Sequence, residues 1–95
     1  MGLRGRSGLP AGTGLLLVFP IEGDVCITAE GVAFATEVLF ARARGEVTAA
    51  ERFAADDARV VCAPARVVLE VEAGALDAEG IECTLELVDV PLPPL

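Results

Sequence analysis

The chain has 95 residues and a formal net charge of −8, and it contains no His, Trp or Tyr. The missing His removes the commonest general base and every Ser–His–Asp or Cys–His arrangement within the chain. The length allows one domain, and the excess of acid opposes binding to nucleic acid or to an anionic membrane. We therefore expect a non-enzymatic domain that needs no cofactor.

Residues 1–14 contain five glycines and one proline without hydrophobic periodicity, which predicts a flexible arm carrying Arg4 and Arg6. A single β-rich domain is expected over residues 15–90, followed by a proline-rich tail at 91–95. The first apolar run, Leu15–Ile21, predicts a buried strand and is far too short to span a bilayer. Because a clean signal-peptide cleavage site is also lacking, we expect a cytoplasmic or virion location.

After the first strand, Glu22, Gly23 and Asp24 indicate a turn, and Val25–Ala29 a short second strand. Between Val32 and Arg44 the large residues all occupy even positions, namely Val32, Phe34, Val38 and Phe40. This period of two favours a long strand that turns at Gly45–Glu46. A helix that ends at Gly45 is the alternative.

The segment Thr48–Arg59 is the best helix candidate of the chain. Thr48 and Glu51 match a capping box and Ala is plentiful, which predicts a helix over about residues 49–58. The alternative is a strand pair that turns at Asp56–Asp57, with Val47 and Phe53 pointing inward. In either case, we expect a short strand at Arg59–Ala63 that ends at Pro64.

Two alternating runs, Val67–Glu72 and Ile81–Val90, flank a segment with two glycines and predict an antiparallel hairpin. Val67, Leu69 and Val71 would face the core from the first run, and Leu85 from the second. The opposite face would be acidic, with the carboxylates of Glu70, Glu72, Glu82 and Glu86. Because these residues lie along strands rather than in a ligand-spaced loop, we interpret them as a solvated face and predict no metal site.

The three cysteines, Cys26, Cys62 and Cys83, each lie in an apolar run. An odd number is a poor disulfide framework, and no His is present to complete a zinc site. We expect all three thiols to be reduced and mostly buried, because free Cys behaves as a small hydrophobe.

These patterns predict a mainly β protein, a small antiparallel β-sandwich or barrel-like domain with at most one short α-helix. The expected function is that of a non-catalytic structural or assembly subunit acting through protein–protein contacts, homo-oligomeric or part of a larger assembly such as a virion. Arg4 and Arg6 could clip onto the acidic face of a neighbouring copy, formed by Glu70, Glu72, Glu82 and Glu86. Two alternatives are a module that encloses a small apolar ligand and an acidic regulator that masks a basic partner protein.

Overall fold

The computed structural model describes residues 3–10 and 12–74 and the backbone of residues 84–89. These residues form five strands and no helix, which confirms the mainly β fold class. The strands are β1 (Thr13–Thr28), β2 (Thr36–Ala41), β3 (Val47–Phe53), β4 (Val60–Glu72) and β5 (Thr84–Asp89). Accordingly, no helix in this part of the chain has the length and apolar content needed to cross a membrane.

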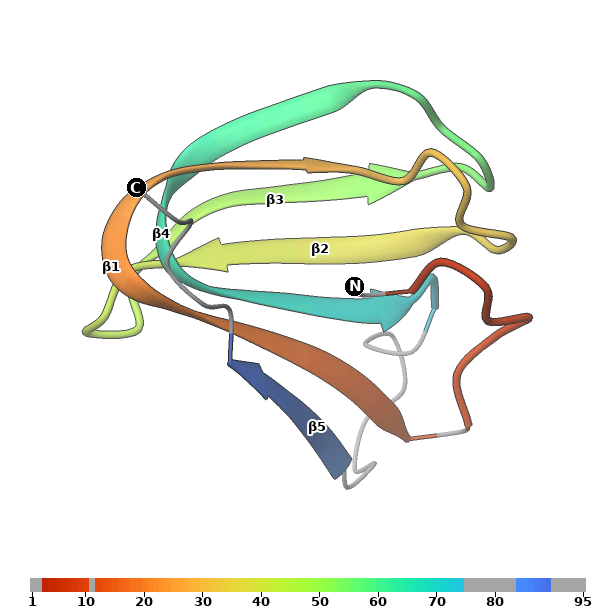
Figure 1. Cartoon of the computed structure of the whole chain (residues 1–95), viewed down its shortest axis with the longest axis horizontal. Helices are drawn as coiled ribbons and strands as arrows, with labels where there is room; N and C mark the ends of the chain where they lie inside the picture. The colour runs from red at the N-terminus through yellow and green to blue at the C-terminus, as the bar shows by residue number, and fades with distance from the viewer. Residues whose placement is uncertain (1–2, 11, 75–83, 90–95) are drawn as a thin grey trace.

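The strands make one sheet in the order β3-β2-β4-β1-β5. β4 pairs antiparallel with both β1 and β2, β2 pairs antiparallel with β3, and β5 runs parallel to β1. The long strands β1 and β4 bend together and return over the sheet (Figure 1). A register shift between Val18 and Gly23 marks the bend, as is usual for a bulge. The sheet therefore curls into a half-barrel with an inner, concave face and an outer face.

The core lies on the inner face. Phe40, Phe53, Leu15 and Val68 are its largest fully buried side chains, and they come from four different strands. Phe40 and Val68 are cross-strand partners between β2 and β4, so their side chains share this face. The returning halves of β1 and β4 contribute the smaller buried residues Val25, Ala63 and Ala65.

The turn predicted at Glu22, Gly23 and Asp24 is wrong. These residues belong to β1, which continues through them to Thr28 as one strand. The bulge beside them lets the strand change direction without reversing, so polar and glycine residues suit an exposed bend as well as a turn. Pro64 has the same position in β4, opposite Asp24, and the strand predicted to end there runs on to Glu72.

The strand predicted between Val32 and Arg44 is confirmed over Thr36–Ala41, and the turn at Gly45–Glu46 follows it. Gly45 has a φ of 88° and donates its N–H to the Arg42 carbonyl at 2.8 Å, so this turn uses a left-handed residue where Gly is favoured. The preceding residues do not extend the strand. They form a loop in which the Val32 N–H donates to the Ala29 carbonyl at 3.0 Å.

The helix predicted over residues 49–58 is wrong, and the strand alternative is correct. β3 pairs along its length with β2 and buries Phe53 completely, although Val47 is 56% exposed rather than inward. Cross-strand pairing and the burial of one Phe outweigh a capping box and a high Ala content, which are weak local preferences. The Thr48 hydroxyl caps no helix; it donates to the Pro64 carbonyl at 2.6 Å and joins β3 to the returning half of β4.

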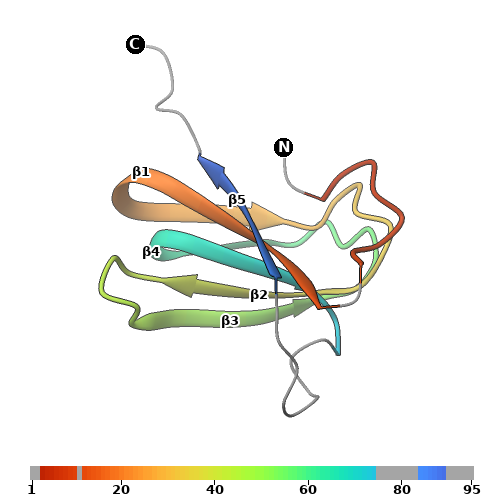
Figure 2. The same ribbon diagram turned by 90° about the horizontal axis from the view of Figure 1, so that it is seen from below.

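The predicted hairpin is also wrong, because β1 lies between β4 and β5 (Figure 2). The faces of β4 are largely reversed as well: Val68 and Glu70 point inward, while Val67 and Leu69 are half-buried on the outer face and only Val71 is buried as predicted. Alternation along a strand does not determine which of its two faces is buried. A shift of one residue in the pairing register exchanges the buried face and the exposed face. The side chain of Leu85 lies outside the described residues.

The glycine-rich segment at the start of the chain packs against the sheet. Leu3 and Leu9 are 3% and 8% exposed and belong to the core. The Leu9 N–H donates to Glu72 Oε2 at 3.4 Å, and the Thr13 N–H donates to the Pro10 carbonyl at 3.0 Å. Residues 3–10, predicted as part of a flexible arm, therefore cover one end of the half-barrel. The predicted tail at residues 91–95 lies outside the described residues.

Candidate functional site

A pocket of about 240 Å³ opens at the covered end of the half-barrel, between the N-terminal segment and the inner face of the sheet. Its walls are the apolar side chains of Leu3, Leu17, Ile27 and Val32. The polar residues Glu70, Arg4 and Thr28 also line it, together with Cys26. We refer to this space as the Glu70 pocket. It brings together residues 3–4, the two halves of β1, the loop after β1 and the C-terminal part of β4.

Glu70 reaches the pocket because of its register in the sheet. It lies opposite Leu15 of β1 and Val38 of β2, both of which face the core. The residue is 8% exposed, and it makes no hydrogen bond or ion pair with any described residue. Burial disfavours the charged form and raises the pKa of the Glu70 carboxyl above its ordinary value of 4.5. Removing a carboxylate from water without giving it a partner is costly, so this residue is the least expected feature of the core.

The loops beside the pocket are held by hydrogen bonds to two Asp residues. Asp56 Oδ1 accepts the Gly31 N–H at 2.8 Å, and the Asp56 N–H donates to the Val32 carbonyl at 2.8 Å. Asp57 accepts the Arg59 N–H at 3.0 Å and the Ala54 N–H at 3.3 Å, and these bonds, the Arg59 one first, lower the pKa of its carboxyl. The turn predicted at Asp56–Asp57 therefore fixes the loop that forms one wall of the pocket.

Arg4 is placed by the same loop. Its side chain lies across Gly31, with Nε 3.4 Å and Cδ 3.5 Å from the position that a Cβ of residue 31 would take. Gly31 has a φ of 82°, so the site favours Gly both in conformation and in space. Arg4 Nε donates to the Glu30 carbonyl at 2.9 Å, and no carboxylate of the described residues lies within ion-pair distance of its guanidinium.

The acidic face predicted from the sequence does not form as expected. Glu70 points inward, and Glu72 is half-buried beside the N-terminal segment of its own chain. Glu82 lies outside the described residues, and Glu86 is placed only by its backbone, opposite Leu15. Arg4 contacts its own chain, and the Arg6 N–H donates to the Leu3 carbonyl at 3.3 Å. Among the described residues, no three His, Cys, Asp or Glu side chains are grouped as metal ligands would be.

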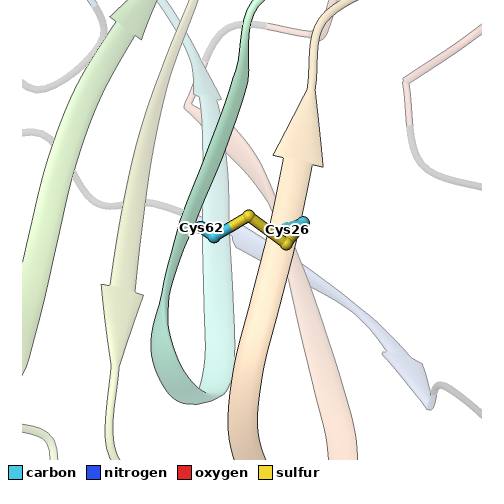
Figure 3. Close-up of a disulfide and its surroundings, with 2 residues drawn as sticks. All are labelled: Cys26 and Cys62. Atoms are coloured by element: carbon cyan, nitrogen blue, oxygen red, sulfur yellow. A yellow bond between two sulfur atoms is a disulfide. The ribbon is translucent and has the colours of Figure 1, made fainter.

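Two of the cysteines form a disulfide, which corrects the prediction of three reduced, buried thiols. Cys26 of β1 and Cys62 of β4 are cross-strand partners with Cα atoms 4.0 Å apart (Figure 3). Both are exposed, because the returning strands present them on the side away from Val25 and Ala63. The bond joins the two strands that form the second layer of the half-barrel. Cys83 lies outside the described residues.

The outer face of the sheet is apolar. Leu16, Leu69 and Leu39 form a row of cross-strand partners over β1, β4 and β2, and Val18, Val67 and Ala41 form the next row. All six are half-buried, and none of the described strands packs across them. The ion pair between Arg52 Nη2 and Glu37 Oε1, at 2.6 Å, lies on the same side toward one end. We call the two rows, the six residues Leu16, Val18, Leu39, Ala41, Val67 and Leu69, the outer apolar face.

A family model described as "DUF192: Uncharacterized ACR" matches residues 1–87. The chain belongs to this family. Neither a curated protein nor a solved structure matches it. The region that matches DUF192 includes the Glu70 pocket, the disulfide and the outer apolar face, so all three features lie within the family domain. The family description itself assigns no activity.

The features of interest were only partly accessible from the sequence. The sequence pattern identifies Glu70, but it predicts the opposite environment, a solvated acidic face. The pairing of Cys26 with Cys62 and the position of Arg4 over Gly31 join residues that are 36 and 27 apart in the chain. One signal was present for Glu70: it is the single acid between Val68 and Val71 in an otherwise apolar strand segment.

Proposed function

We infer that this DUF192 protein is a non-catalytic subunit that acts through protein–protein contact, and that a second copy of the chain docks on its outer apolar face. The observation that carries the proposal is the double row of Leu, Val and Ala side chains on a sheet face that none of the described strands covers. Apolar sheet faces of this kind pack against one another in β-sandwiches. A face that packs against its own copy forms a two-fold, isologous interface, the commonest arrangement in homo-oligomers.

The charged side chains described beside this face are compatible with a second copy. The acid and the base near the face, Glu37 and Arg52, are already paired with each other. Glu37 also accepts the Gly74 N–H at 2.9 Å, which is the main reason why its pKa is lowered, with Arg52 as a further cause. Among the side chains that the structure describes, packing two faces together therefore buries no isolated charge, which would be the main local cost of such an interface.

Salt dependence separates this proposal from the alternative of a basic partner. Two copies, each with a net charge of −8, repel each other at long range, so salt should strengthen their association by screening. Binding to a basic protein would be weakened by salt for the same reason.

The proposal is tested by sedimentation equilibrium of the full chain and two variants. Wild type should form dimers, more readily at higher salt, and Leu39→Lys should be monomeric because it places a charge within the first row of the face. Ile21→Lys is the matched control, since Ile21 is an apolar residue that is 65% exposed at the bend of β1 and belongs to neither row. The proposal is wrong if wild type is monomeric at every concentration and salt, or if the two variants associate equally.

A further inference from the structure

The Glu70 pocket lies on the inner side of the sheet, apart from the outer apolar face, so a function for it goes beyond the contact proposed above. The pocket is smaller than the roughly 300–1,000 Å³ of pockets that hold drug-sized molecules. Its ligand must therefore be small. The side chains of Leu17, Ile27 and Val32 give it an aliphatic wall, which a short hydrocarbon group would fill.

The carboxyl of Glu70 supplies the first polar contact. Among the described residues, every fully enclosed side-chain oxygen or nitrogen makes a hydrogen bond. The Glu70 carboxyl makes none with these residues, although only 8% of the residue is exposed. Its oxygens must therefore keep a path to solvent, and at this depth the path is the pocket that it lines. A ligand ammonium would give this carboxylate the donors that the protein does not.

The guanidinium of Arg4 supplies the second contact. It lines the same pocket from the N-terminal segment, while the hydrogen bond of Nε to Glu30 and the close approach over Gly31 limit its movement. The two terminal nitrogens keep donors for a further acceptor, and a carboxylate matches them in geometry and charge. The pocket thus has an acid and a base that are not paired with each other, and aliphatic side chains line the same space.

We propose that the Glu70 pocket binds a small apolar amino acid, with its ammonium on Glu70, its carboxylate on Arg4 and its side chain against Leu17, Ile27 and Val32. A plain amine would place a second cation in a pocket that Arg4 already lines, and a plain carboxylate would meet Glu70. Only a ligand with both groups satisfies the two side chains at once. A peptide lacks this pattern unless it is very short, because the pocket has room for little beyond one aliphatic residue.

The test is a methyl and backbone NMR titration of the full chain with three matched probes: L-leucine, isoamylamine and 4-methylpentanoate. L-Leucine should shift the resonances of Ile27, Val32 and Leu17 in a saturable way, and the two probes that lack one charged group should bind at least about tenfold more weakly. Glu70→Gln and Arg4→Gln should each weaken L-leucine binding at least about tenfold. Arg42→Gln is the control, because Arg42 is paired with Glu22 at 3.4 Å, outside the residues that line the Glu70 pocket.

The proposal is overturned if L-leucine shifts none of the three residues, or if it binds Glu70→Gln as well as wild type. Equal binding of isoamylamine and L-leucine would also overturn it, since Arg4 would then contribute nothing. Each variant is checked by circular dichroism and by its amide spectrum, so that a lost fold is not mistaken for a lost contact. Because Leu39→Lys leaves this pocket intact, its response to L-leucine is independent of whether the outer apolar face forms a dimer.

Discussion

The disulfide between Cys26 and Cys62 should supply a large share of the stability of this domain. It closes a loop with a sequence separation of 36, for which the loss of chain entropy in the unfolded state amounts to about 3.8 kcal/mol at 25 °C. Residual structure in the reduced unfolded chain lowers this figure, so we expect reduction to cost about 2–4 kcal/mol. The total free energy of unfolding of a small domain is about 5–15 kcal/mol, so the urea concentration at the unfolding midpoint should fall markedly on reduction.

The assay is urea unfolding of wild type with and without a phosphine reductant, alongside a Cys26→Ala/Cys62→Ala double variant. Both cysteines are exposed, so their replacement by Ala removes little buried apolar surface and mainly removes the cross-link. The double variant should resemble reduced wild type and should not respond to the reductant. The reasoning is refuted if oxidised and reduced wild type unfold at the same midpoint. Alkylation of Cys26 and Cys62 in the native protein without reductant would refute the disulfide itself.

Three further predictions concern the core and its edges. Phe53→Ala should lower the unfolding free energy by about 3–5 kcal/mol, because Phe53 is completely buried, whereas Val60→Ala, at a residue that is 63% exposed, should change it by less than about 0.5 kcal/mol in the same urea titration. Thr48→Val should cost about 1–3 kcal/mol by leaving the Pro64 carbonyl without its donor, which the same titration measures. Glu70→Gln should be more stable than wild type at neutral pH and should lose this advantage in acid. The pKa of Glu70 is raised in the folded protein, so the folded state is favoured below the ordinary value of 4.5 and loses that contribution as the pH rises through the raised value. Unfolding curves at pH 3 and pH 7 check this, and equal differences at both would contradict it.

Local sequence patterns predicted the local features of this fold. The period of two identified β2, the turn at Gly45 was correct, and Phe53 was placed inward by the strand alternative. These features depend on neighbouring residues, whose alternation and turn chemistry can be read directly. The prediction of a helix over residues 49–58 was wrong because an Ala-rich segment can form either a helix or a strand. Pairing with a neighbouring strand, here β2, decides which of the two forms.

The features that failed depend on contacts distant in the chain. The parallel pairing of β5 with β1 replaced a hairpin that looked favourable locally, and the insertion of β1 between β4 and β5 has no local signature. The inward position of Glu70 follows from its neighbours Leu15 and Val38 on other strands, and the Cys26–Cys62 bond from the register of β1 and β4. Strand order and register decide which residues contact each other across the sheet. Neither can be predicted from the local pattern of a single sequence.

The central claim, that a second copy packs on the outer apolar face, is tested most directly by NMR on a mixture of isotope-labelled and unlabelled chains. Isotope-filtered spectra of such a mixture record only contacts between copies. We predict intermolecular methyl contacts among Leu16, Leu39 and Leu69, at concentrations where sedimentation shows dimers. Dimers whose intermolecular contacts lie elsewhere, for example along the edge strand β3, would contradict the account.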